Sequence, residues 1–133
     1  MPPKRVILVE DDPDDLELFA TFLSGRNDII LLPPVGNGIE LTKFLETIPN
    51  KADLPDLIVL DQNMPLMNGK QTLLYLAQHP RYSKITAVIY STYADTSLIM
   101  DCKKLGARLV ASKPIDAEGY NKMMDDFLAV IHV

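Results

Sequence analysis

The sequence predicts a three-layer α/β domain, in which helices cover both faces of one parallel sheet, and two observations carry this prediction. Five short apolar segments recur at near-regular intervals along the 133 residues, and a segment with the spacing of an amphipathic helix follows each of them. The apolar segments are continuous rather than alternating, as is typical of parallel strands buried on both faces. Five strand–helix units in alternation predict one doubly wound domain over residues 1–133, without an output domain.

The expected strands are the apolar segments 6–9, 29–32, 57–60, 87–90 and 109–111. The expected helices lie between and after them, at about 13–24, 38–47, 70–78, 95–105 and 115–131. Pro13 suits the first position of a helix, where its missing N–H is not needed. Gly25 and Gly106 are expected to stop the first and fourth helices, because glycine is favoured just past a helix end.

Composition limits the class of protein. Hydrophobic residues make up 47% of the chain and charged residues 23%, so the chain can bury a core without stabilising disulfides or a structural metal. The single cysteine, Cys102, excludes an intramolecular disulfide and fits a reducing cytoplasm. No apolar stretch approaches the roughly 18 residues that cross a bilayer. The net charge of −5 and the lack of a basic stripe argue against direct nucleic-acid binding.

Polar residues follow four of the five expected strands. Glu10 and Asp11 follow the first, Asp61 the third, Ser91 the fourth and Lys113 the fifth. Because the carboxyl ends of parallel strands meet at one edge of the sheet, where such folds bind ligands, we expect these side chains to converge. Each separate residue has an ordinary explanation as a turn, cap or solvated side chain, and the convergence is what favours a site.

This combination of groups predicts phosphoryl chemistry. Carboxylates about 4–6 Å apart repel one another by roughly 1–4 kcal/mol, and a divalent cation relieves that repulsion. A ligand set made of oxygens favours Mg²⁺, Mn²⁺ or Ca²⁺ over zinc. Lys113 adds a second positive charge and Ser91 a hydroxyl donor, so that an incoming phosphoryl group is neutralised beside the Asp61 carboxylate. The predicted reaction is formation of an aspartyl phosphate at Asp61.

The acidic run continues beyond the expected site. Asp12, Asp14 and Asp15 lie at the start of the first helix, where negative side chains complement the helix dipole. We interpret these three residues as helix-terminal charges with no further role.

Three stretches of the chain match a known pattern: Ile7 to Pro13, Leu57 to Gly69, and Ser112-Lys113-Pro114. The middle stretch contains the string Asp-x-Asn-Met-Pro-x-Met-x-Gly, which is highly specific. Together they make the chain similar to the receiver domain of bacterial two-component response regulators, over essentially its whole length. The resemblance implies a flavodoxin-like fold with strand order 2-1-3-4-5, and a cis bond between Lys113 and Pro114.

The resemblance also implies roles for the site residues. Asp61 corresponds to the phosphoacceptor, with Ser91 and Lys113 contacting the phosphoryl group. Glu10, Asp11, Asp61 and the backbone carbonyl of Asn63 correspond to the ligands of Mg²⁺. The implied partners are a sensor histidine kinase or a histidine phosphotransfer protein, and a downstream protein target. Such a domain is no enzyme beyond its own phosphorylation and dephosphorylation, and it is cytoplasmic.

Two residues depart from the family pattern. Val110 stands on the fifth strand where the family often has Tyr or Phe, and Thr92 stands where a small residue is usual. Neither change touches the phosphorylation chemistry. Both lead us to expect that the signal leaves the site through the segment from Thr92 into the fourth helix, with Tyr93 as the side chain that reorients.

Three other classes of protein fit less well. A haloacid-dehalogenase-like phosphatase requires a second Asp where this chain has Asn63. In a flavodoxin-like FMN protein, Glu10, Asp11 and Asp12 would repel the bound phosphate. The main alternative is a degenerate receiver that binds partners without phosphorylation, although no residue of the active-site pattern is missing here.

Overall fold

The computed structural model describes residues 2–131 and contains one five-stranded parallel sheet in the order β2-β1-β3-β4-β5, as predicted. The strands are β1 (Lys4–Val9), β2 (Ile29–Leu31), β3 (Leu57–Asp61), β4 (Thr86–Ser91) and β5 (Val110–Ser112). The helices are α1 (Pro13–Leu23), α2 (Gly38–Glu46), α3 (Gly69–Gln78), α4 (Thr96–Lys104) and α5 (Ala117–Ala129), with a short 3₁₀ turn η1 (Lys51–Asp53). Each expected element is present, and each of its ends lies within two residues of the expected position.

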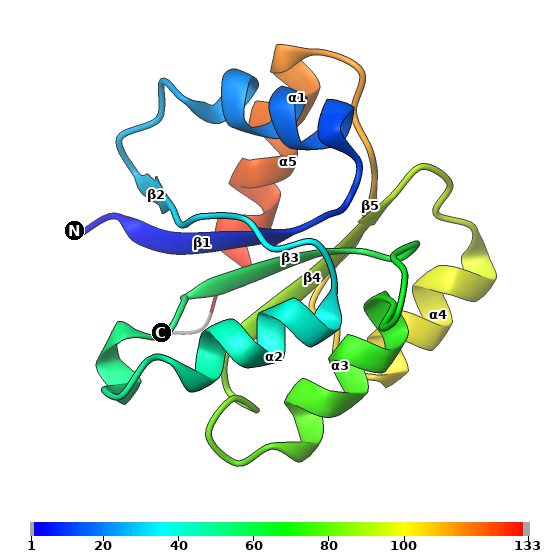
Figure 1. Cartoon of the computed structure of the whole chain (residues 1–133). Helices are drawn as coiled ribbons and strands as arrows, with labels where there is room; N and C mark the ends of the chain where they lie inside the picture. The colour runs from blue at the N-terminus through cyan, green and yellow to red at the C-terminus, as the bar shows by residue number, and fades with distance from the viewer. Residues whose placement is uncertain (1, 132–133) are drawn as a thin grey trace.

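The sheet separates two layers of helices. Helices α1 and α5 lie on one face, and α2, α3 and α4 cover the other (Figure 1). Successive residues of β1 alternate between the two cores, with Val6 and Leu8 facing α1 and α5, and Ile7 and Val9 facing the other helices. A strand buried on both faces needs apolar residues at every position, which explains the continuous apolar segments. Cys102 of α4 is fully buried and packs in the core between the sheet and helices α2, α3 and α4, as its helical spacing predicts.

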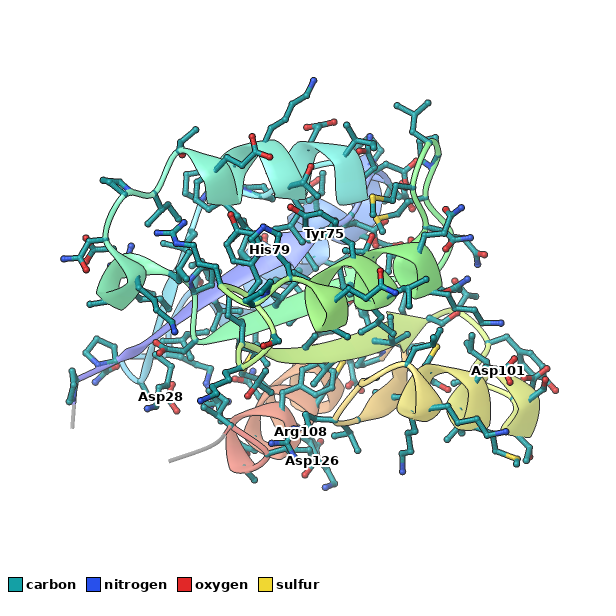
Figure 2. The ribbon with its side chains drawn as sticks, turned by 90° about the horizontal axis from the view of Figure 1, so that it is seen from below. Asp28, Tyr75, His79, Asp101, Arg108 and Asp126 are labelled. Atoms are coloured by element: carbon teal, nitrogen blue, oxygen red, sulfur yellow. The ribbon has the colours of Figure 1, made fainter. Side chains whose placement is uncertain are left out.

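An aromatic cluster closes the domain at the end opposite the carboxyl ends of the strands. Figure 2 shows Tyr75 of α3 next to His79, the residue just after this helix, with ring centroids 5.6 Å apart. His79 also stacks on Tyr82 at a centroid distance of 4.2 Å. Because α3 runs antiparallel to the strands, this cluster anchors the last turn of α3 while its first turn lies beside the acidic residues.

The helix ends follow the expected signals. Pro13 is the first residue of α1, and the side chain of Asp12 caps it by accepting from the Asp14 amide at 3.2 Å. Gly106 has φ of 111° just past α4, a conformation that favours glycine. Gly25 lies just past the end of α1, directly after the C-cap residue Ser24, whose hydroxyl donates to the Thr21 carbonyl at 2.9 Å.

The bond between Lys113 and Pro114 is trans, like every other peptide bond within residues 2–131, so the expected cis bond is wrong. Trans is the more stable form of an X–Pro bond by about 0.5–1 kcal/mol, and only tertiary context reverses so small a preference.

The part of the chain that the structure describes holds no helix both long enough and apolar enough to cross a membrane.

Candidate functional site

Three carboxylates converge at the carboxyl ends of neighbouring strands. Glu10 and Asp11 follow β1, and Asp61 is the last residue of β3. One oxygen of each lies within 4.8 Å of an oxygen of the other two, as the sequence predicts. Glu10 is 1% exposed and Asp61 is 4% exposed, whereas Asp11 faces solvent. Two buried negative charges and one exposed charge therefore share one small volume, and oxygen donors so arranged suit a hard divalent cation.

Lys113, in the loop after β5, extends its ammonium into this cluster. Its Nζ lies 2.7 Å from an oxygen of Asp15, 3.0 Å from Glu10 and 3.4 Å from Asp61. The side chain is only 11% exposed. The ammonium also lies 4.9 Å from the centroid of the Tyr90 ring, where a cation is attracted by the ring face. A single buried cation thus partly neutralises three carboxylates.

Glu10 is held by four donors. Its Oε2 accepts from the backbone amides of Asp11 at 3.1 Å and Asp12 at 3.2 Å. Its Oε1 accepts from the Tyr90 hydroxyl at 2.8 Å and from Lys113 at 3.0 Å. This saturation fixes the position of the carboxylate and accounts for the burial of a charge that otherwise costs several kcal/mol.

The electrostatics of Asp61 reflect its crowded surroundings. Burial, reinforced by the neighbouring Glu10 carboxylate, raises the pKa of Asp61 from 3.8 to about 7. Lys113 and the backbone amide of Asn63 act in the opposite direction. For Lys113, burial lowers the pKa, but the hydrogen bonds to Asp15 and Glu10 outweigh this effect and raise it, so the side chain stays charged. Lys113 alone does not compensate Asp61 fully, and a further positive charge at the cluster would favour its ionised form.

The loop after Asp61 is built tightly against it. The Gln62 carbonyl accepts from the Gly69 amide at 3.1 Å, and the Gln62 side chain accepts from the Lys70 amide at 3.0 Å. A Cβ atom on Gly69 would lie 3.0 Å from the Asp61 carbonyl oxygen, so any larger residue would require the backbone after Asp61 to shift. Leu66 has φ of 65°, a strained conformation for a leucine. These features give a physical reason for the spacing between Asp61 and Gly69 in the sequence.

The other predicted site residues lie around this cluster. Ser91 ends β4, is 2% exposed, and its carbonyl accepts from the Lys113 amide at 2.8 Å. Asn63 is exposed two residues after Asp61, and its amide donates to Asp61 Oδ1 at 3.4 Å. In the sheet register, Asp61 pairs with Tyr90 and Ser91 with Ser112. The predicted residues therefore lie along one edge of the sheet, as expected.

The sequence pattern does not identify two residues of the site. It predicts Tyr90 only as part of an apolar strand, and Asp15 only as a helix-terminal charge. A tyrosine inside an apolar run signals that its hydroxyl needs a partner, but not which one. Helical spacing places Asp15, four residues before the inward Phe19, on the buried side of α1, but only the tertiary structure brings Lys113 beside it.

Comparison with known proteins points to one family. Residues 6–125 match the family model described as the response regulator receiver domain. Protein PilH of Pseudomonas aeruginosa is 26% identical over 126 residues, which are 94% of this chain and 98% of PilH. A protein-glutamate methylesterase/protein-glutamine glutaminase of Clostridium acetobutylicum is 30% identical over 131 residues, 97% of this chain. The chain spans only 36% of that relative and 29% of the corresponding protein of Bacillus licheniformis.

Solved structures show the same fold. The Mn²⁺-bound form of response regulator Rcp1 is 25% identical, with a TM-score of 0.77 over 96% of this chain and 93% of Rcp1. The acidic cluster here is of the kind that receiver domains use for a divalent cation. The family model covers nearly the whole described structure, and the fold and the acidic cluster agree with it. The chain therefore belongs to the response regulator receiver domain family of two-component signalling modules.

Proposed function

We propose that Asp61 accepts a phosphoryl group in a Mg²⁺-dependent reaction and that the domain signals by changing its protein contacts. The observation that carries this proposal is the set of groups gathered beside the buried Asp61 carboxylate. Oxygens of Glu10 and Asp11 lie within 4.8 Å of an Asp61 oxygen, and the Lys113 ammonium lies 3.4 Å from Asp61. A carboxylate next to both a cation-binding pair and an ammonium is arranged to receive an anionic group.

The residues present fit a magnesium ion. Glu10, Asp11, Asp61 and the backbone carbonyl of Asn63 would hold it, and all are the oxygen ligands that Mg²⁺ prefers. The ion supplies positive charge that neutralises the phosphoryl oxygens. The Asp61 carboxylate, whose pKa is raised to about 7, is only partly ionised at neutral pH, and positive charge added beside it favours the ionised form.

The chain's own residues perform the transfer. An oxygen of the ionised Asp61 attacks phosphorus and forms a P–O bond while the bond between phosphorus and the donor breaks. In phosphohistidine the donor atom is an imidazole nitrogen, which keeps the bonding electron pair and leaves as neutral imidazole because the other ring nitrogen carries a proton. Lys113 pairs with one phosphoryl oxygen, and Ser91 donates its hydroxyl to another.

The proposed phosphoryl donor is a histidine kinase or a histidine phosphotransfer protein, since membership of the receiver family implies such a partner. The downstream protein is a target that recognises the phosphorylated form. A receiver that works without phosphorylation would not need Asp61, Lys113 and the acidic pair together, which favours the phosphorylated reading.

Incubation with acetyl phosphate and Mg²⁺, followed by intact mass spectrometry, tests the proposal. We expect one added phosphoryl group on the parent protein and none on Asp61→Asn, in which the amide is no nucleophile. Asp56→Asn is the control, because Asp56 lies before β3, at the other end of the sheet, and its carboxylate accepts from the Arg5 amide. Labelling of Asp61→Asn to the parent's level, or no labelling of the parent, would overturn the assignment.

A further inference from the structure

We propose that Asp15 is a positioning residue that competes with the phosphoryl group for Lys113. This competition lowers the affinity of the site for the phosphoryl group. This inference rests on the proposed function, since it assumes that Lys113 pairs with a phosphoryl oxygen on Asp61. It concerns a carboxylate that belongs neither to the phosphoacceptor nor to the cluster of Glu10, Asp11 and Asp61.

The geometry singles out Asp15. Of the three carboxylates that surround the Lys113 ammonium, Asp15 is the nearest, with an oxygen 2.7 Å from Nζ, and Asp61 is the farthest at 3.4 Å. The contact joins the first turn of α1 to the loop after β5, across 98 residues of sequence. The Asp15 side chain is 21% exposed and that of Lys113 is 11% exposed, so this ion pair is shielded from water better than a surface pair.

Two of the three N–H donors of the Lys113 ammonium are used in this state. They donate to Glu10 at 3.0 Å and to Asp15 at 2.7 Å, while Asp61 lies beyond the reach of a good hydrogen bond. A phosphoryl group on Asp61 draws the ammonium toward it. Glu10 shares the cluster with Asp61, with oxygens within 4.8 Å of each other, and is fixed by Tyr90 and by two backbone amides. The contact that lengthens is therefore the one with Asp15.

The neighbouring residue Asp14 supplies a matched control. Asp14 and Asp15 are consecutive residues in the first turn of α1, with the same charge and the same relation to the helix dipole. Asp14 faces solvent, and within residues 2–131 its carboxylate takes part in no ion pair. Asp14→Asn and Asp15→Asn thus remove equal charge, and only the second frees Lys113.

The experiment measures the affinity for beryllofluoride, formed from beryllium chloride and sodium fluoride, as a phosphoryl mimic. Backbone amide NMR shifts report binding to the parent, Asp15→Asn, Asp14→Asn and Asp15→Glu. Each protein is held at about ten times its own Kd for Mg²⁺, so that a change in metal affinity does not enter the comparison. We expect Asp15→Asn to bind beryllofluoride about five- to tenfold more tightly than the parent, as loss of a partly shielded ion pair implies.

Two readouts separate competition from a merely structural role. Asp14→Asn should stay within about twofold of the parent, and Asp15→Glu, which restores the carboxylate, should return the affinity toward the parent value. The ¹⁵N resonance of the Lys113 ammonium should move in Asp15→Asn before any beryllofluoride is added, and should not move in Asp14→Asn.

The outcomes distinguish this inference from the function on which it rests. If the parent binds no beryllofluoride and takes no phosphoryl group, the proposed function fails. If the parent binds beryllofluoride and Asp15→Asn binds it with equal affinity, only the competition fails. Weaker binding by Asp15→Asn also overturns the competition, because it would mean that Asp15 holds Lys113 in its productive position.

Discussion

The hydroxyl of Tyr90 donates a hydrogen bond of 2.8 Å to Glu10, although Tyr90 lies on β4, Glu10 follows β1, and β3 runs between them. Both residues are buried. Burial and the nearby Glu10 charge raise the pKa of Tyr90 well above the ordinary tyrosine value of 10.0, so its hydroxyl stays protonated and remains a donor. This hydrogen bond therefore links β4 to the residue after β1 and positions the Glu10 carboxylate, which is expected to bind the cation.

Tyr90→Phe should destabilise the protein, because it removes a donor to a buried charged acceptor. A hydrogen bond to a charged group contributes about 1.5–3 kcal/mol, and we expect a loss in that range from urea unfolding at neutral pH. Tyr120→Phe is the matched control, since the Tyr120 hydroxyl is equally buried and has no partner among the described residues. Its removal should be neutral or stabilising. Equal losses in the two variants would mean that the Tyr90 bond contributes nothing specific.

Magnesium should raise the thermal stability of the parent protein. The carboxylates of Glu10, Asp11 and Asp61 repel one another, and a ligand that binds only the folded state stabilises it by about 1 kcal/mol at a few times its Kd. Thermal melts over a Mg²⁺ series should show a rising midpoint, and Asp11→Asn should blunt the rise. Asp28→Asn, remote from the cluster and paired with Arg26, is the control. A midpoint indifferent to Mg²⁺ would argue for a degenerate site.

Without metal, Asp61 should make stability depend on pH. Burial and Glu10 raise the pKa of Asp61 from 3.8 to about 7, so the folded state holds the proton more tightly than the unfolded state. The resulting stability is complete below about pH 4 and is lost as pH rises through about 7. In EDTA, the stability of Asp61→Asn relative to the parent should therefore increase over this range, by a few kcal/mol in total. Urea midpoints that differ by a constant amount from pH 4 to 8 would contradict the cause given for this shift.

Lys113→Ala should destabilise the metal-free protein and abolish its response to a phosphoryl mimic. Removing one partner of a buried ion pair costs about 3–5 kcal/mol, because Glu10 and Asp61 are left without their counter-charge. Mg²⁺ should restore part of this loss, since it neutralises the same carboxylates. Chemical unfolding with and without Mg²⁺ measures the recovery. Amide NMR shifts identical to the parent's on adding beryllofluoride would show that the lysine does not pair with the phosphoryl group.

The signal should leave through the segment from Thr92 to Leu98. Val110, half-buried on β5, is short and stiff at its first torsion, so it cannot swing into space vacated by Ser91. Tyr93 is 76% exposed and free to reorient at the start of this segment. Aromatic and methyl NMR spectra with and without beryllofluoride should show large changes at Tyr93 and Leu98. Changes confined to β5, with residues 92–98 unmoved, would rule out this route.

The sequence by itself determined the layered α/β fold and the location of the site. A strand buried on both faces must be apolar throughout, and parallel strands bring their carboxyl ends to one edge. The residues after four apolar segments were therefore sufficient to place Glu10, Asp11, Asp61 and Lys113 together, and the structure does so. These predictions succeeded because they depend on chain direction and on burial, which local sequence encodes.

Only the tertiary structure decided how the charges are paired. Tyr90 and Asp15 reach their partners across 80 and 98 residues of sequence, through the sheet register and through the contact of the first turn of α1 with the loop after β5. The bond before Pro114 keeps the trans form that an X–Pro bond prefers by about 0.5–1 kcal/mol, and local sequence does not say whether tertiary contacts reverse so small a preference. Helical spacing puts Asp15 rather than Asp14 on the inward side of α1, but its pairing with Lys113 is determined only when the distant segments pack together.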